Sequence, residues 1–448
     1  MENQPLVNDK KEIFGWMMYD WANSAFSTTI GAALLGPYIT TLAENAKEPL
    51  QLFGTAIRPA AIYPFFISLS VLLQVLFLPL IGTLADYTPN KKRLMMSFAY
   101  LGAALTILLF FVQADMPVIG TNGAVLLGSL LFTGANLSFG AAVVAYNSFL
   151  NDISTPDRRD AISSQGWALG YLGGGLLLLL NLGLILAMKD TGLAVRISLA
   201  SAGVWWLVFT FLFPQRRLRQ RFPPKTLPKG ENLFSFGLHK LQETLREMRA
   251  KYPRTGQYLI AYLVYNDGIQ TVIATASLFA ASELGLPSTS LLLLVLMIQF
   301  VAFGGALLFG KLAERIGAKR SIIITLVIWA GITIFAYAIL RTEAQLFALG
   351  VVLALVMGGS QALSRSLFSQ MIPHAKEAEY FGFYEISERG TSWLGPILFS
   401  LAVQLTGSQR VALLSLIAFF IIGLILLIPV NVKQAIVESG NNPDGVIL

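Results

Sequence analysis

The chain has 448 residues, of which 55% are hydrophobic and 13% are charged, whereas a soluble domain carries about 25% charged residues. That composition excludes an ordinary soluble protein. The chain contains no cysteine, which excludes disulfides, thiolate catalysis and cysteine metal sites. Its two histidines, His239 and His374, fall in predicted loops, so neither a metal site nor a bound cofactor is expected.

Apolar stretches of membrane-spanning length fill most of the chain. About 20 consecutive apolar residues cross a bilayer as one helix, which satisfies its own backbone hydrogen bonds. About twelve such stretches are present, at residues 16–43, 62–86, 93–113, 121–150, 162–187, 194–213, 256–281, 288–314, 319–340, 345–372, 380–406 and 409–430. We therefore expect an all-α membrane protein.

The positions of lysine and arginine predict the orientation, because cytoplasmic loops carry an excess of both. With the N-terminus inside, the short cytoplasmic loops hold Lys91, Lys92, Arg93, Arg158, Arg159, Arg315, Lys319 and Arg320. We expect both termini in the cytoplasm. No cleavable signal peptide is expected, because the first apolar run is too long for a signal's core. The same bias explains the net charge of +7 without nucleic-acid binding.

A polar connector divides the spans into two sets of six. We predict an N-terminal half at 1–213, a cytoplasmic linker at 214–255, a C-terminal half at 256–430 and a cytoplasmic tail at 431–448. The string Gly82-Thr-Leu-Ala-Asp86 after the second span resembles Gly310-Lys-Leu-Ala-Glu314 after the eighth, which indicates an internal repeat. Six-helix repeats of this kind place a solute site between the halves, near the middle of the membrane.

Within the linker, Leu238, Leu241, Leu245 and Met248 recur at helical spacing beside basic residues. This pattern predicts an amphipathic helix on the cytoplasmic face of the membrane. Two interpretations are open, a latch or regulatory surface and a surface helix that ties the halves together. The second is preferred.

Several strings carry a family resemblance. The stretch 82–93 resembles the loop signature of the major facilitator superfamily, with Tyr87 in place of a basic residue and Pro89 in place of a glycine. The string Tyr-Asp-Trp-Ala-Asn-Ser-Ala-Phe at 19–26, with the strings at 361–366 and 381–384, resembles the bacterial "unknown major facilitator" family. That family's fungal relatives are autophagy-related vacuolar amino-acid effluxers.

The resemblance implies the major facilitator fold, with two six-helix bundles, and secondary transport in the cytoplasmic (inner) membrane of a bacterium. Amino-acid export is a further, less specific implication. It also implies a gating role for Asp86 of the loop signature.

Polar residues inside the spans are candidates for the transport chemistry. A charged side chain at the centre of a spanning helix costs roughly 2.5–3.5 kcal/mol on insertion scales, so it needs a partner or a function. The candidate solute or proton site comprises Asp20, Asn23, Asn136, Asn147, Gln165, Trp167, Tyr265, Asn266, Asp267, Gln270 and Gln361. The polar residues of spans one and seven hold corresponding positions in the two halves, where a shared cavity would be lined.

Two carboxylates among them are given different roles. Asp267 is the deepest carboxylate in the sequence, and it is expected to exchange a proton or to bind a solute amine. A structural carboxylate paired with a neighbouring helix is the alternative. Asp20 lies nearer the cytoplasmic end of its span, which favours a capping or gate-bonding role.

Charged residues near the cytoplasmic ends of the spans are candidates for an inner gate. The candidate gate comprises Asp86, Arg93, Glu314, Arg365, Glu385, Glu388 and Arg389. Glu385 and Arg389 are four residues apart and are expected to pair along their own helix. That leaves Arg365 and Glu388 as the pair predicted to bridge spans ten and eleven. A gate network is preferred, and a proton relay is the alternative.

The leading functional hypothesis is a secondary active transporter of a small organic solute, such as an amino acid, moved outward in exchange for protons. The alternative is a lipid or lysolipid translocator. No enzyme is expected, because the sequence offers no nucleophile–base pair, and the phosphate-loop-like string at 305–311 is followed by Leu312 where a serine or threonine is required. A receptor or scaffold is disfavoured by the paired polar stripes. The expected partners are the solute, protons and membrane lipids, and the expected state is a monomer.

Overall fold

The computed structural model describes residues 7–52, 54–220, 233–390 and 394–447. Within these ranges, nine helical segments are long and apolar enough to cross a membrane. Three further spans are a helix with a π-helical interruption (α1, η1 and α2), the more polar helix α10, and the segment that contains α14, η4 and α15. Nine and three give the twelve predicted spans.

The first half is built from α1 Lys10–Ala25, η1 Phe26–Leu34, α2 Leu35–Glu44, α3 Pro59–Tyr87, α4 Lys91–Leu108, η2 Leu109–Phe111, α5 Gly120–Ile153, η3 Pro156–Arg158, α6 Arg159–Ala187, α7 Thr191–Leu212 and α8 Pro214–Arg217. A two-residue antiparallel pair, β1 Gln51–Leu52 and β2 Thr55–Ala56, lies in the loop between α2 and α3. The linker contributes α9 Leu233–Ala250.

The second half is built from α10 Pro253–Leu284, α11 Ser288–Ile316, α12 Ala318–Ala338, α13 Glu343–Gln370, α14 Glu377–Glu385, η4 Ile386–Gly390, α15 Leu394–Thr406, α16 Gln409–Ser415, α17 Ile417–Leu427 and α18 Val432–Glu438. Local sequence explains where several of these helices begin. At α13, Thr342 accepts the Gln345 backbone N–H, and the Gln345 side chain accepts the Thr342 N–H, which is a capping box.

Each half has its own hydrophobic core. One cluster of buried residues runs from Ile13 to Leu218, and a second is formed almost entirely from Met248 to Ile436. A third, small cluster joins the halves and consists of Leu78, Ala85, Ala141, Val144 and Ala378. Because most apolar packing lies within a half, the contacts between halves are a separate and smaller set.

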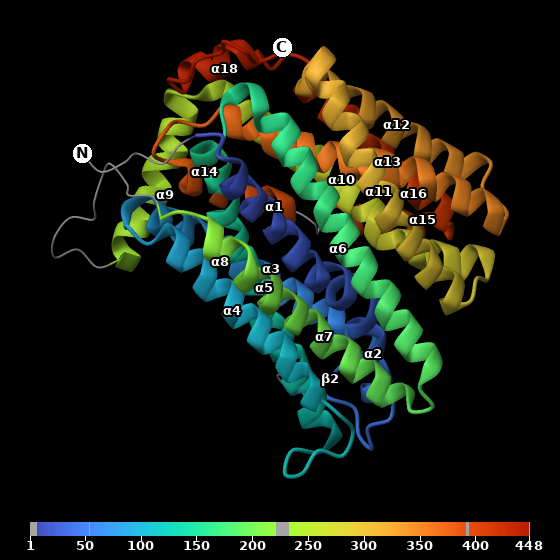
Figure 1. Ribbon diagram of the computed structural model, residues 1–448. Helices are drawn as coiled ribbons and strands as arrows, with labels where there is room; N and C mark the ends of the chain where they lie inside the picture. Colours follow the sequence, from blue (N-terminus) through green and yellow to red (C-terminus); the bar gives the residue numbers. More distant parts are fainter. Residues whose placement is uncertain (1–6, 53, 221–232, 391–393, 448) are drawn as a thin grey trace.

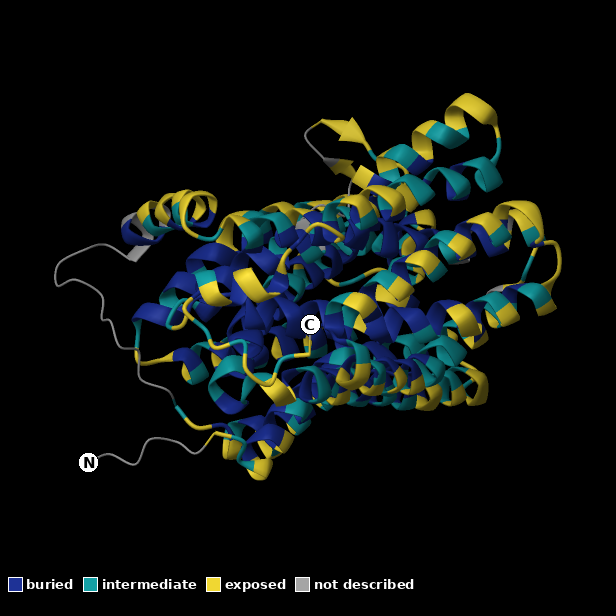
Figure 2. Cartoon of the chain, turned by 90° about the horizontal axis from the view of Figure 1, so that it is seen from above, coloured by how far each residue is buried: buried dark blue, intermediate teal, exposed yellow. Residues whose placement is uncertain are grey.

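The linker helix α9 and the C-terminal helix α18 lie at one end of the bundle (Figure 1). We call this the linker end. Buried residues gather in the middle of the bundle and toward this end, whereas helix ends on the far side are mostly intermediate or exposed (Figure 2). The halves are therefore packed most tightly against each other near the linker end.

A helix is present in the linker, and its predicted apolar stripe is buried in part. Met248 is buried, as expected for an apolar stripe, whereas Leu245 is 50% exposed. The side chain of Leu238 lies outside the described residues. The buried face instead includes Phe236, whose ring lies 5.2 Å from that of Tyr87 at the end of α3. The helix therefore packs on the first half as well as leading into the second.

Candidate functional site

Arg365 of α13 is the centre of a buried polar cluster between the halves. Its Nη1 and Nη2 both donate to Oδ2 of Asp20 in α1, each at 3.2 Å. Nε donates to Oγ of Ser163 in α6 at 2.9 Å, and Nη2 donates to the Ser163 carbonyl at 2.9 Å. Nη1 also reaches Oδ1 of Asn147 in α5 at 3.3 Å. A residue of the second half thus binds three helices of the first.

Aromatic rings surround the guanidinium group. The rings of Trp16, Tyr146 and Trp167 lie 4.8, 5.6 and 5.4 Å from its central carbon. The hydroxyl of Tyr146 donates to the same Asp20 oxygen at 2.7 Å. A cation on ring faces gains electrostatic attraction, most strongly where water is excluded. The buried charge of Arg365 is therefore balanced by one carboxylate and by the rings.

Asn147 extends the cluster toward α14. Its Nδ2 donates to Oε1 of Glu385 at 2.7 Å, while its Oδ1 accepts from Arg365. Nearer the linker end, Nδ2 of Asn151 and Nη1 of Arg159 both donate to the carbonyl of Ser369, at 2.8 and 3.1 Å. The polar contacts between the halves therefore run in a row along α5, α6 and α13.

A second contact joins α3 to the beginning of α14. The carboxylate of Asp86 accepts the backbone N–H groups of Ala378 and Glu379, at 3.1 and 2.7 Å. These are free N–H groups of a helix N-terminus, where negative charge is favoured. A Cβ atom on Gly82 would lie 2.2 Å from the Ala378 carbonyl oxygen, so glycine is needed for this close crossing. We call the Arg365 cluster and this crossing the linker-side gate.

Within the stretch 82–93, the buried basic residue is Lys91 rather than Arg93. Lys91 pairs with Asp152 at 2.9 Å and is buried. Arg93 is exposed, and its Nη1 reaches only Asn90 Oδ1 at 3.5 Å. Arg93 therefore lies outside the linker-side gate in this conformation, and its gating role stays a prediction. The reason is helical geometry, because positions two apart on α4 point about 200° apart and cannot both face α5.

The carboxylate that Arg365 binds in this conformation is that of Asp20, and the predicted pair of Arg365 with Glu388 stays a prediction. Glu388 lies in the π-helical segment η4, and its backbone carbonyl accepts from Asn266 Nδ2 of α10 at 3.2 Å. The segment is thus held against α10, while Arg365 points toward α1 and α6. The expected pair of Glu385 with Arg389 stays a prediction, because the Arg389 side chain lies outside the described residues.

Asp267 occupies a structural position in this conformation. Its Oδ2 accepts the Gly395 backbone N–H at 2.8 Å, near the beginning of α15. The side chain is buried, and Oδ1 has no hydrogen-bond partner among the described residues. Its neighbour Tyr265 shares a hydrogen bond of 2.7 Å with Ser364. The residues predicted on span seven therefore contact α13, η4 and α15 rather than one common point.

The remaining predicted residues are scattered. Gln361 accepts from the hydroxyl of Tyr171, and Asn136 donates to Ser70 at 2.8 Å within the first half. Gln165 is exposed, two positions from Ser163 and Trp167 and so on the opposite side of α6. The others are placed as follows: Asn23 is buried, Gln270 is half-buried, and Glu314 is exposed at the end of α11. The structure thus brings Asp20, Asn147, Trp167, Arg365 and Glu385 into one cluster and places Asp86 in the neighbouring crossing.

Sequence analysis missed several gate residues. Ser163, Asn151 and Ser369 are small or neutral residues, which are common in membrane helices and give no separate signal. Asp152 is a charged residue at the end of a span and could have been singled out, but its partner Lys91 is distant in sequence.

A hydrogen bond of 2.8 Å to Glu377 raises the pKa of His374, in the loop between α13 and α14.

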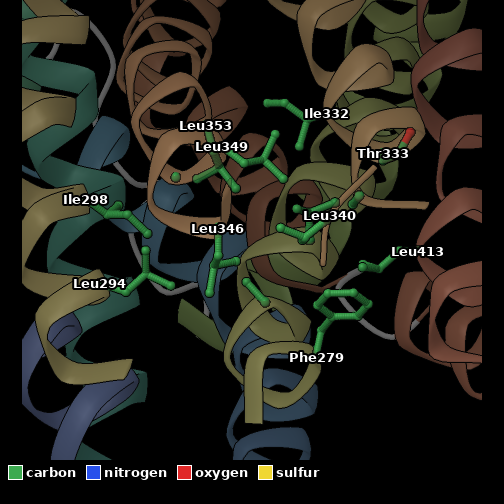
Figure 3. A pocket seen from close by; sticks show the side chains of 14 residues that line it. Phe279, Leu294, Ile298, Ile332, Thr333, Leu340, Leu346, Leu349, Leu353 and Leu413 are labelled. Atoms are coloured by element: carbon green, nitrogen blue, oxygen red, sulfur yellow. The ribbon is translucent and has the colours of Figure 1, made fainter. Parts of the chain in front are cut away.

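An apolar cavity lies within the second half, away from the gate (Figure 3). Its walls come from α10, α11, α12, α13 and α16 and include Phe279, Leu294, Ile332, Leu353 and Leu413. Thr333 is the one polar side chain among the lining residues, and it bonds to the carbonyl of Ala330. None of the predicted solute-site residues lines this cavity. Within the described residues, no group of three or more His, Asp or Glu side chains could hold a metal ion.

Two six-helix halves closed against each other by a polar gate are the architecture of a carrier. A family model described as "Vacuole effluxer Atg22 like" matches residues 8–157 and 150–440, which together include both halves. The chain belongs to this family. The resemblance to the bacterial "unknown major facilitator" family and its fungal relatives is thereby confirmed.

Relatives from bacteria and fungi agree with the family. The chain is 31% identical over 423 residues to YxiO of Bacillus subtilis (strain 168), described as an uncharacterized MFS-type transporter, and the match covers 93% of this chain and 94% of YxiO. It is 27% identical over 486 residues to autophagy-related protein 22 of Yarrowia lipolytica, covering 87% of this chain and 80% of that protein.

Solved structures share the fold. A bacterial homologue of the iron transporter ferroportin, in an outward-facing state, matches with a TM-score of 0.65 and 17% identity, over 94% of this chain and 99% of its own. The Escherichia coli fucose:proton symporter matches with a TM-score of 0.67 and 13% identity, over 93% and 97%. The protein therefore has the twelve-helix major facilitator fold. With the family match and the 31% identity to YxiO, it is a multi-pass membrane transporter of this superfamily.

Proposed function

We propose that the protein is a secondary active transporter that exports a small organic solute by alternating access, in exchange for protons. The observation that carries this proposal is the linker-side gate, a set of polar contacts joining two halves that have separate hydrophobic cores. Such an interface can break and re-form while each half stays packed, as rocking of one half against the other requires. In this state the gate is closed.

Amino acids or related compounds are the proposed solute class, and the word "effluxer" in the family description favours the outward direction. We further propose that the protein is a monomer in the bacterial cytoplasmic membrane, with the linker end facing the cytoplasm. The basic residues of the loops at that end favour this orientation. The moving units would be residues 1–213 and 256–430, joined by the linker at 214–255, with 431–448 as a cytoplasmic tail.

The apolar cavity of the second half favours one alternative, the transport of a lipid or lysolipid, because its lining is chemically similar to an acyl chain (Figure 3). Counterflow in proteoliposomes distinguishes the two. A panel of amino acids should include at least one that is exchanged and that accumulates when a proton gradient is imposed. Movement of a labelled lysolipid across the bilayer, with no exchange of any amino compound, would instead establish the alternative.

Asp267→Asn tests whether this carboxylate carries the coupling proton. The amide mimics a permanently protonated acid, and its oxygen can still accept the Gly395 N–H. We expect proton-driven accumulation to be lost, while exchange of the solute down its own gradient persists. If Asp267 binds a solute amine instead, the substitution should weaken the binding of amino compounds and leave the binding of uncharged analogues unchanged.

A matched control for this substitution is Asp115→Asn, which removes a carboxylate from an exposed loop far from α10. This control should leave proton-driven accumulation and solute exchange unchanged. Wild-type pH dependence together with wild-type affinity in Asp267→Asn would show that Asp267 is structural, as a cap for α15.

A further inference from the structure

Glu379 is a buried acid that the mechanism described above does not use. It lies in the first turn of α14, inside the linker-side gate, and is 1% exposed. Neither carboxyl oxygen has a hydrogen-bond partner among the described residues. Neighbouring acids of the gate are different, since Asp86 accepts two backbone N–H groups and Glu377 bonds to His374.

The charged groups around Glu379 do not supply a partner either. Asp86 faces it from α3 and already accepts its backbone N–H at 2.7 Å. Lys376, just before α14, forms an ion pair with Glu247 of α9. Lys240 of α9 pairs with Glu243 at 2.5 Å and lies over the ring of Tyr87.

These contacts favour a neutral Glu379 in the closed gate. An ionised carboxylate without a hydrogen bond or an ion pair is strongly disfavoured when buried, and the group takes up a proton instead. A second negative charge also stands close by, on Asp86. When α14 separates from α3, the Glu379 side chain would meet water, where the ionised form is stable.

We propose that Glu379 is a proton-binding site of the linker-side gate. Its carboxyl group takes one proton from water at the linker end as the gate closes and returns that proton when the gate opens. The O–H bond of the acid is the bond that forms and breaks, and no other reactant is needed. Closure is therefore favoured at low pH and loses that advantage as the pH rises.

The proposal goes beyond solute transport and can be tested without a solute. The chain has no cysteine, so spin labels can be placed on introduced cysteines at Asn90 and Arg320, both exposed at the linker end. Distances between the labels, measured in the full-length protein from about pH 5 to about pH 9, report the ratio of closed to open gates. In the wild type this ratio should fall by up to about tenfold per pH unit, because one proton is involved.

Glu379→Gln should hold the gate closed at every pH and remove this dependence, because the amide has the shape of the protonated acid. Glu379→Asp should keep a pH dependence, with a shifted midpoint. His374→Gln and Glu44→Gln are controls, since one removes the nearby histidine and the other an exposed carboxylate at the end of α2; both should behave as the wild type does.

Infrared difference spectra give a second readout, because a protonated carboxyl group has its own carbonyl band. That band should appear on closure in the wild type and be absent in Glu379→Gln. A pH-independent wild type, or a pH dependence that survives in Glu379→Gln or disappears in His374→Gln, would overturn the proposal. Each of these outcomes is independent of which solute is carried and of whether transport is proton-coupled.

Discussion

Arg365→Ala is expected to open the linker-side gate and to reduce transport more than a hundredfold. The substitution removes the cation and leaves Asp20 buried without its ion partner. Breaking a buried pair in this way costs about 3–5 kcal/mol. Because the pair joins the two halves, the loss falls on the closed state and shifts the population toward the open one. Label distances at the linker end and counterflow of the solute measure the two effects.

Arg410→Ala is the matched control for this prediction. Arg410 also bonds to a carboxylate, that of Glu283 at 3.2 Å, and lies 5.5 Å from the ring of Phe279. All of these residues belong to the second half, so the loss of the Arg410 contacts should not change the ratio of closed to open gates. A double-mutant cycle of Arg365→Ala with Asp20→Asn should be non-additive. Additive effects would show that the pair does not couple the halves.

Gly82→Ala is expected to prevent the gate from closing and to reduce transport at least tenfold. The added Cβ would stand 2.2 Å from the carbonyl oxygen of Ala378 and 3.0 Å from the Cα of Glu379. Both atoms are backbone, so no side-chain rotation can relieve the clash, and α14 must move away from α3. Asp86 would then lose the helix N-terminus that it caps. Thiol reagents should reach cysteines placed on this crossing faster than in the parent protein.

Gly382→Ala provides a second variant of the same crossing, because its Cβ would lie 2.9 Å from the Cα of Pro79. Gly331→Ala in α12 is the control, since nothing lies within 4 Å of an added Cβ there. An alanine at that position should leave the gate unchanged and, within a helix, add up to about 1 kcal/mol of stability. Normal closure in both Gly82→Ala and Gly382→Ala would contradict the assignment of this crossing to the gate.

The sequence predicted the spans well, because membrane insertion depends on the length and polarity of contiguous segments. The span predicted at 121–150 is α5 Gly120–Ile153, and the one at 345–372 is α13 Glu343–Gln370. The placement of Arg365, Asp20 and Asp86 near one end of the bundle was also readable, since position along a helix follows from residue number.

Partnership across the halves was decided by the tertiary structure. Asp20 and Arg365 are 345 residues apart, and no local pattern shows which face of α13 turns toward α1. The π-helical segment η4 changes the register of span eleven, and regular helical spacing does not anticipate this change. Glu379, whose carboxyl group has no hydrogen-bond partner among the described residues, has no signature in the sequence either, because its surroundings come from α3 and α9. Hydrophobicity specifies which segments cross the membrane, but the packing of one half on the other specifies which charges meet.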